Sequence, residues 1–79
     1  MNMDYKQILA DIARAIVDSP DCVTVTEESE GEDIELVLSV APDDMGMVIG
    51  RHGRIAKAIR ALMKAAAASE GKRITVEIR

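Results

Sequence analysis

A glycine-bounded turn separates two apolar segments in the stretch Val48-Ile49-Gly50-Arg51-His52-Gly53-Arg54-Ile55. Two glycines around two residues let the backbone turn tightly, because glycine lacks a Cβ and adopts positive φ readily. Apolar residues then recur at helical spacing. The pattern predicts a helix over about 54–69, ended by Gly71, with an apolar face formed by Ile55, Ile59, Leu62 and Ala66. The stretch therefore predicts a short loop that leads directly into a long amphipathic helix.

The segments on either side of this loop predict two further helices and three strands. An apolar stripe of Tyr5, Ile8, Leu9, Ile12 and Ile16 predicts a helix over 4–18, and Pro42 begins a short helix that buries Met45, Val48 and Ile49. β-Branched or alternating residues predict strands over 22–26, 34–40 and 73–79, with an acidic hairpin turn over 27–33. We expect an α+β fold of order α-β-β-α-α-β, with helices on one face of a three-stranded sheet. Residues 1–79 are expected to form a single domain.

The composition limits the kinds of protein that this chain can be. It has 79 residues, near the lower end of what folds on one core, and 48% are hydrophobic. No apolar run approaches the roughly 20 residues of a membrane span, and the first residues do not resemble a secretory signal. Cys22 has no second cysteine to pair with, and neither a zinc-ligand set nor a calcium loop is present. We expect a cytoplasmic protein without a membrane segment, metal, cofactor or small-molecule substrate.

Charge is divided unevenly along the chain. The net charge is −4, yet residues 1–46 hold twelve acidic and two basic residues, a balance of −10. Residues 47–79 hold eight basic and two acidic residues, a balance of +6, and five of these bases lie between residues 51 and 64. The acidic half is expected to solvate a surface, whereas the concentrated bases indicate an anionic partner.

The Gly50–Gly53 turn has the composition of a phosphate-binding loop. A phosphodiester approaches bare glycine backbone closely, and the N–H groups and dipole of the following helix point at the same place. Basic residues in the turn and along one side of the helix add charge attraction, which favours holding a sugar-phosphate backbone with little base reading. The predicted binding residues are Ile49, Gly50, Arg51, His52, Gly53, Arg54, Ile55, Lys57, Arg60 and Lys64.

This turn, the Val-Ile pair before it and the basic helix after it resemble the KH domain, whose Gly-x-x-Gly loop holds about four nucleotides of single-stranded nucleic acid. The element order is similar to the bacterial type II arrangement. Over essentially its whole length the chain resembles the small bacterial single-KH RNA-binding proteins of the KhpA type, chiefly in residues 5–16 and 48–60. Two features depart from the broader KH pattern. Ile55 and Ile59 lie two and six residues after the second glycine, and His52 stands where a lysine or another polar residue is common.

The resemblance implies a cytoplasmic, low-specificity binder of single-stranded RNA that acts as an RNA chaperone or post-transcriptional regulator. It also implies pairing with a second copy or with a larger protein of the KhpB type, also called Jag or EloR. A link to cell shape and cell-wall biogenesis in bacteria is implied by the resemblance alone.

The scarcity of aromatic residues limits how tightly one copy binds. Tyr5 is the single aromatic residue, and its place on the helix stripe predicts a core position rather than a base-stacking platform. Bases are expected to contact aliphatic walls, with Ile49 and Ile55 as candidates, so one copy should bind weakly. Weak binding gives dimerisation a physical reason, because two copies on one strand bind more tightly. The expected dimer contact is the small-residue surface of Ala61, Ala65 and Ala68 beside Leu62.

Two other classes of function are alternatives to RNA binding. A protein-interaction adaptor, whose partner supplies most of the RNA contacts, is favoured by the alanine-rich helix face and the small core. An enzyme is not expected, because a lone His52, a lone Cys22 and hairpin acids do not form partnered catalytic groups. The glycine spacing also matches neither a Walker loop nor a dinucleotide fingerprint. RNA binding through the loop and basic helix remains the leading hypothesis.

Overall fold

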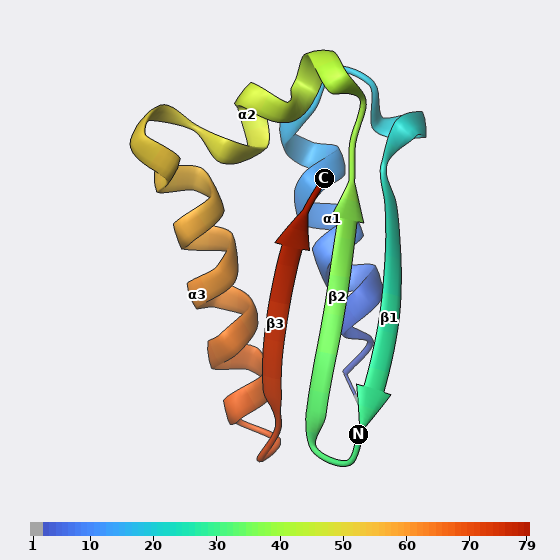
Figure 1. Ribbon diagram of the computed structural model, residues 1–79, viewed down its shortest axis with the longest axis vertical. Coiled ribbons are helices and arrows are strands. Elements are labelled where there is room, and N and C mark those ends of the chain that lie inside the picture. The colour runs from blue at the N-terminus through green and yellow to red at the C-terminus, as the bar shows by residue number, and fades with distance from the viewer. Residues whose placement is uncertain (1–2) are drawn as a thin grey trace.

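The computed structural model describes residues 3–79 and contains six main elements in the expected order (Figure 1). They are α1 (Tyr5–Ile16), β1 (Thr24–Glu30), β2 (Asp33–Ser39), α2 (Met45–Ile49), α3 (Arg54–Ala68) and β3 (Arg73–Ile78). Single turns of 3-10 helix lie at Pro20–Cys22, Pro42–Asp44 and Arg51–Gly53. The predicted α+β fold and its type II KH order α-β-β-α-α-β are confirmed.

β2 is the central strand of the sheet, with β1 antiparallel on one side and β3 parallel on the other. Its alternation directs Ile34, Leu36 and Leu38 to one face, where each is 6% exposed or less. A parallel neighbour requires a crossover connection, which α2 and α3 supply. This crossover places the Gly50–Gly53 turn at the end of the molecule opposite the β1–β2 hairpin (Figure 1).

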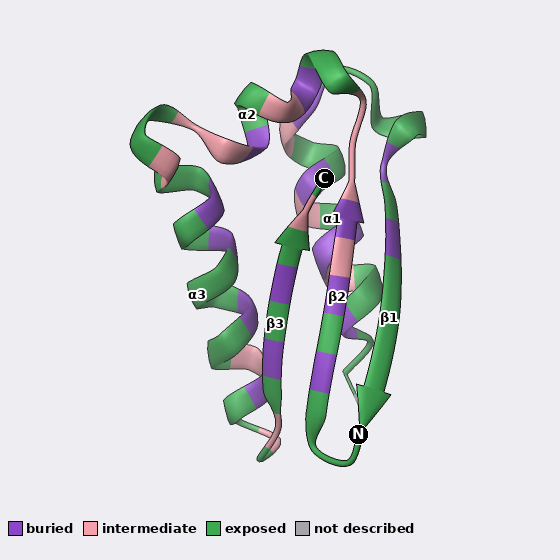
Figure 2. Ribbon diagram, in the orientation of Figure 1, coloured by how far each residue is buried: buried purple, intermediate pink, exposed green. Residues whose placement is uncertain are grey.

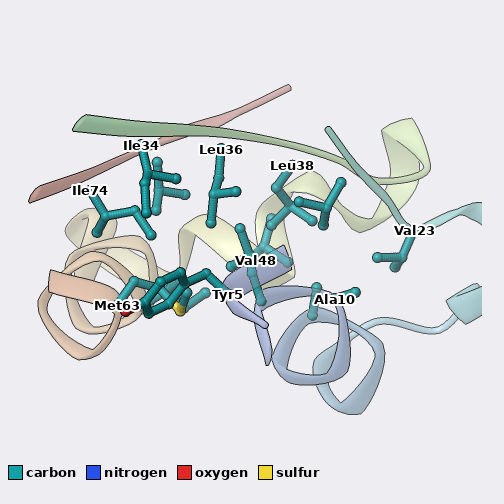
Figure 3. Close-up of a cluster of buried hydrophobic side chains, with 14 of the residues drawn as sticks. Tyr5, Ala10, Val23, Ile34, Leu36, Leu38, Val48, Met63 and Ile74 are labelled. Carbon is teal, nitrogen blue, oxygen red and sulfur yellow. The ribbon is translucent and has the colours of Figure 1, made fainter. Parts of the chain in front are cut away.

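α1 and α3 pack on the same face of the sheet and form the core with it. Figure 3 shows Ile34, Leu36 and Leu38 pointing from the sheet toward Tyr5 and Met63 on the helices. Tyr5 is 3% exposed, and its hydroxyl donates a hydrogen bond to the carboxylate of Glu70. The predicted core position of the single aromatic residue is therefore confirmed. It lies far from the Gly50–Gly53 turn, at the other end of α3.

α3 turns a different apolar face to the sheet from the predicted one. It buries Ala56, Ile59, Met63 and Ala67, whereas Ile55 is 39% and Leu62 is 56% exposed. In Figure 2 the buried parts of the α3 ribbon lie on the side toward β3. The prediction was right for Ile59, which is buried, and for Ala66, which is partly buried against the core, but wrong for Ile55 and Leu62. Both stripes repeat at helical spacing, and the larger side chains were preferred. Small alanines let the helix approach the sheet closely, and the flexible Met63 side chain fills the remaining space. The branched side chains of Ile55 and Leu62 therefore stay on an exposed flank.

β1 is longer than predicted and begins later. It runs to Glu30, and only a short turn at Gly31, which has φ +62°, connects it to β2. The acidic segment predicted as a turn is therefore mostly strand, because pairing with β2 satisfies the backbone and an exposed edge tolerates charge. Cys22 was expected at the start of the strand. It lies instead in the exposed turn Pro20–Cys22.

Candidate nucleic-acid interface

Gly50 ends α2 in a backbone conformation that is essentially restricted to glycine, with φ 76° and ψ 174°. A Cβ on Gly50 would lie 2.3 Å from Cγ1 of Ile55 and 3.0 Å from its backbone nitrogen. Both distances are shorter than van der Waals contact. The fold itself therefore requires glycine at position 50, because a residue without a Cβ lets the end of α2 pack against the first turn of α3.

Gly53 and His52 complete the turn with left-handed backbone, at φ 72° and φ 57°. For His52, a residue with a Cβ, this conformation costs about 1–2 kcal/mol. A Cβ on Gly53 would meet no atom within 4 Å, so the space beside it is open to a ligand. Gly53 also provides no side-chain cap for α3. The N–H of Arg54, at the start of α3, donates to the carbonyl of Arg51, while the positive end of the helix dipole favours an anion here.

Asp44 connects the entrance of this turn to the rest of the fold. It is 2% exposed, and its carboxylate accepts a hydrogen bond of 3.0 Å from the backbone N–H of Ser19. The bond joins the segment after α1 to the start of α2. This contact holds α2, and with it the turn, at one end of the sheet.

The cations of residues 51–64 are exposed and form no ion pair with an acid among residues 3–79. Ion pairs in the described part of the chain join Arg14 to Asp11, Arg73 to Asp33 and Arg79 to Glu77, and none involves these cations. Their set is Arg51, Arg54, Lys57, Arg60 and Lys64, all on the surface. An uncompensated group of this kind attracts a polyanion, since no local acid has to be displaced first.

A surface depression of about 490 Å³ runs along one flank of α3. His52 and Gly53 of the turn line it together with Lys57, Arg60, Ala61 and Lys64 of the helix. The Arg60 side chain is held between α3 and the sheet edge, because its Nε–H donates to the Val76 carbonyl at 3.1 Å. The arrangement is a bare backbone turn followed by a row of cations, which suits a phosphate chain lying along the helix.

The structure brings only part of the predicted site into this depression. His52, Gly53 and the three helix cations line it, whereas Arg51 and Arg54 are exposed nearby in the turn and at the start of α3. Ile49 is half-buried at the end of α2. Ile55 lies about 200° around the helix from Lys57, at about 100° per residue, and therefore on the other flank. Ala61 was predicted as a dimer contact and not as part of the RNA site, because a small apolar residue among cations does not itself indicate RNA binding.

Metal-ligand clusters of three or more His, Cys, Asp or Glu residues are absent from residues 3–79. Within the same residues, no helix has the length and apolar character needed to cross a membrane.

Comparisons with known proteins agree with the fold. The profile of the family described as "KhpA/KhpB, KH domain" matches residues 6–78. A protein named "RNA-binding protein KhpA" from Clostridium acetobutylicum is 58% identical over 73 residues, which cover 92% of this chain and 97% of the relative. Proteins of the same name are 54% identical in Caldanaerobacter subterraneus subsp. tengcongensis (91% of this chain, 96% of the relative) and 50% identical in Treponema pallidum (92% and 91%). With the Gly-x-x-Gly turn and the type II order already described, these matches show that the chain belongs to the KhpA/KhpB KH-domain family.

Proposed function

We propose that this protein binds single-stranded RNA by gripping the phosphate backbone with the Gly50–Gly53 turn and the basic flank of α3. The observation that carries the proposal is the row of five exposed cations without acidic partners, beside a turn whose second glycine faces open space. The names of the matched relatives, which are RNA-binding proteins, support the same ligand. They also agree with the expectation that the chain is not an enzyme.

Backbone binding of this kind should be weak, salt-sensitive and poorly selective. The depression is lined by no aromatic side chain, so it lacks the roughly 1–3 kcal/mol per base that stacking provides. Three to five phosphate contacts are expected from the cations present. For a single strand they give a slope of log K against log salt of roughly −2 to −3.5.

Replacing Arg51 and His52 together with aspartate tests the loop. Asp tolerates the left-handed backbone of position 52, so the fold should persist. We expect RNA affinity to fall about tenfold or more, and the salt slope to become less steep by about 0.7–1.4. Lys6→Asp/Gln7→Asp on the exposed side of α1 is the matched control, because it changes the charge by the same amount. RNA binding that survives in the loop variant with an unchanged salt slope would exclude the loop as the site.

We further infer that two copies pair through the other flank of α3. Leu62 is 56% and Ile55 is 39% exposed there, and two large apolar side chains on the same flank of one helix form a candidate contact surface. Ala61 and Ala68, expected beside Leu62, line the basic side instead, so the proposed contact is narrowed to Leu62 with Ile55 and Ala65. Pairing places two weak sites on one RNA strand, which raises the apparent affinity. A KhpB-type protein is the alternative occupant of the same flank.

The family resemblance implies a cytoplasmic role as an RNA chaperone or post-transcriptional regulator, and this mode of binding is compatible with it. Low selectivity and weak affinity let a protein act on many RNAs and release them. The link to cell shape and cell-wall biogenesis rests on the family resemblance, and RNAs recovered with the native protein would test it.

The exposed apolar flank also favours a second function, that of an adaptor whose partner makes most of the RNA contacts. Ultraviolet crosslinking of the isolated chain to RNA separates the two functions. Direct binding predicts crosslinks in residues 51–64, whereas a pure adaptor would yield none.

A further inference from the structure

His52 lies inside the Gly50–Gly53 turn and is the single histidine of the chain. It is exposed, and it lines the depression that runs along the basic flank of α3. Among residues 3–79, its imidazole takes part in no hydrogen bond and no ion pair. Both ring nitrogens are therefore available to a ligand in this depression.

The backbone at position 52 restricts which side chains fit there. Its φ of 57° and ψ of 25° lie in the left-handed region, where asparagine, aspartate and histidine are enriched among the residues with a Cβ. Aspartate would repel a phosphate, and asparagine would stay neutral. Histidine is the one residue of the three that can carry a positive charge, and it does so only when both ring nitrogens are protonated. The turn therefore contains a charge that depends on pH, next to the permanent charge of Arg51.

The helices that pack against the turn contribute only cations to the surroundings of His52. The Arg51–Gly53 segment contacts α2 and α3 (Figure 1). α2 has no charged residue, and the charged residues of α3 are Arg54, Lys57, Arg60 and Lys64. The acid nearest in sequence, Asp44, is buried and accepts a hydrogen bond from Ser19. Neither helix supplies a counterion for the imidazolium, and a phosphate of bound RNA would be that counterion.

We propose that RNA binding by this protein is linked to protonation of His52, so that the affinity rises as the pH falls through the range in which imidazole titrates. The inference rests on the proposed function, because the linked ligand is the same RNA phosphate. A phosphate beside the turn attracts the imidazolium and not the neutral ring, so the protonated protein binds RNA more tightly. By reciprocity, bound RNA favours the uptake of the proton by the same factor. The other cations of the flank set the basal affinity, and His52 adjusts it.

Affinity for a short oligouridine, measured by fluorescence anisotropy at about pH 8 and about pH 5.5, tests this linkage. Uracil neither gains nor loses a proton between these two values. Protonation adds one exposed ion pair, so the affinity of the unmodified protein should be about 2- to 5-fold higher at the lower pH. The slope of log K against log salt should be steeper there by about 0.7, because one more phosphate is neutralised.

Two substitutions at position 52 separate the proton from the rest of the turn. His52→Asn keeps a residue suited to the left-handed backbone but cannot take up the proton, so its affinity should be the same at both pH values. His52→Lys carries its charge at both values, so its affinity should also stay constant between them. Each protein is compared with itself, and a change in basal affinity therefore does not affect the result. Circular dichroism checks that both variants are folded.

The single histidine allows a second measurement, because the ring protons of the untagged protein give one set of imidazole NMR signals. The midpoint of their titration should move to higher pH when the oligouridine is added. Equal affinity of the unmodified protein at both pH values would overturn the linkage and leave RNA binding by the turn intact. An equal rise in His52→Asn would assign the pH dependence to other groups and overturn the linkage as well. If the unmodified protein binds the oligouridine at neither pH, the proposed function itself fails.

Discussion

Replacing Gly50 with alanine should destabilise the fold by about 2–6 kcal/mol, because two separate costs add at this position. The backbone, at φ 76° and ψ 174°, costs a residue with a Cβ about 1–3 kcal/mol. The new Cβ would also lie 2.3 Å from Cγ1 of Ile55, and relieving that overlap costs about another 1–3 kcal/mol. A domain of 79 residues has a total stability of about 4–12 kcal/mol. The substitution therefore removes a large part of it.

Urea unfolding followed by far-ultraviolet circular dichroism measures this loss against two other glycines. Gly53→Ala has positive φ but open space around the new Cβ, so it should cost only about 1–2 kcal/mol. Gly46→Ala lies in α2 without positive φ or any atom within 4 Å, and should stabilise the protein by up to about 1 kcal/mol. From the most to the least stable, the expected order is Gly46→Ala, unmodified protein, Gly53→Ala and Gly50→Ala.

Shortening Ile55 separates the two costs at Gly50. Gly50→Ala made in an Ile55→Ala background loses the contact with Cγ1, so the substitution should cost less there than in the unmodified protein. The overlap with Cβ and the backbone nitrogen of residue 55 remains, and so does the backbone cost. The reasoning is refuted if Gly50→Ala costs no more than Gly53→Ala, or if its cost is the same in both backgrounds.

Three further predictions concern the apolar flank, the Tyr5–Glu70 hydrogen bond and the anchor of α2. Leu62→Glu should abolish self-association in size-exclusion chromatography with light scattering at unchanged helix content; an unchanged mass would contradict pairing through this flank. The hydrogen bond raises the pKa of Tyr5 from 10.0 to about 12 and lowers the pKa of Glu70 from 4.5. The bond therefore stabilises the fold most between about pH 5 and 10, and its contribution fades as pH rises toward 12 or falls below 4.5. Tyr5→Phe should flatten both limbs of the pH–stability curve, and identical curves would exclude this origin. Asp44→Ala should cost about 1–3 kcal/mol because the Ser19 N–H loses its acceptor; Asp44→Asn keeps an acceptor and should cost less, so equal losses would argue against the bond.

The element order could be predicted because each element carries its own local signal. The alternation of β2 and β3, the apolar stripe of α1 and the Gly-x-x-Gly turn are patterns that need no knowledge of distant residues. The charge division also identified α3 as the basic element before its neighbours were known. β1 was predicted poorly because its acidic residues disfavour strand, and only pairing with β2 extends it to Glu30.

The candidate site could be predicted where it is continuous in sequence. The turn and the three helix cations follow one another within fifteen residues, so their spacing alone places them together. The depression between the end of α3 and the start of β3 was not predicted, because Lys64 and Arg73 line it together only after the chain reverses between these two elements. No periodic pattern crosses such a reversal, and the lysine and arginine after it resemble ordinary surface charges.

The sequence by itself determined the architecture, the place of the turn and the sign of the charge around it, since each depends on residues close together in the chain. Tertiary structure decided which side of α3 is buried, because the sequence contains two apolar stripes at helical spacing. Close packing on the sheet buries the stripe with Met63 and the alanines and leaves Leu62 exposed. The tertiary structure also gives the two glycines of the turn different roles. Gly50 is required by Ile55, which folds back against it, whereas Gly53 faces open space where a phosphate can approach. That difference arises from contacts across the turn, so the four-residue motif alone cannot show which glycine is required by packing.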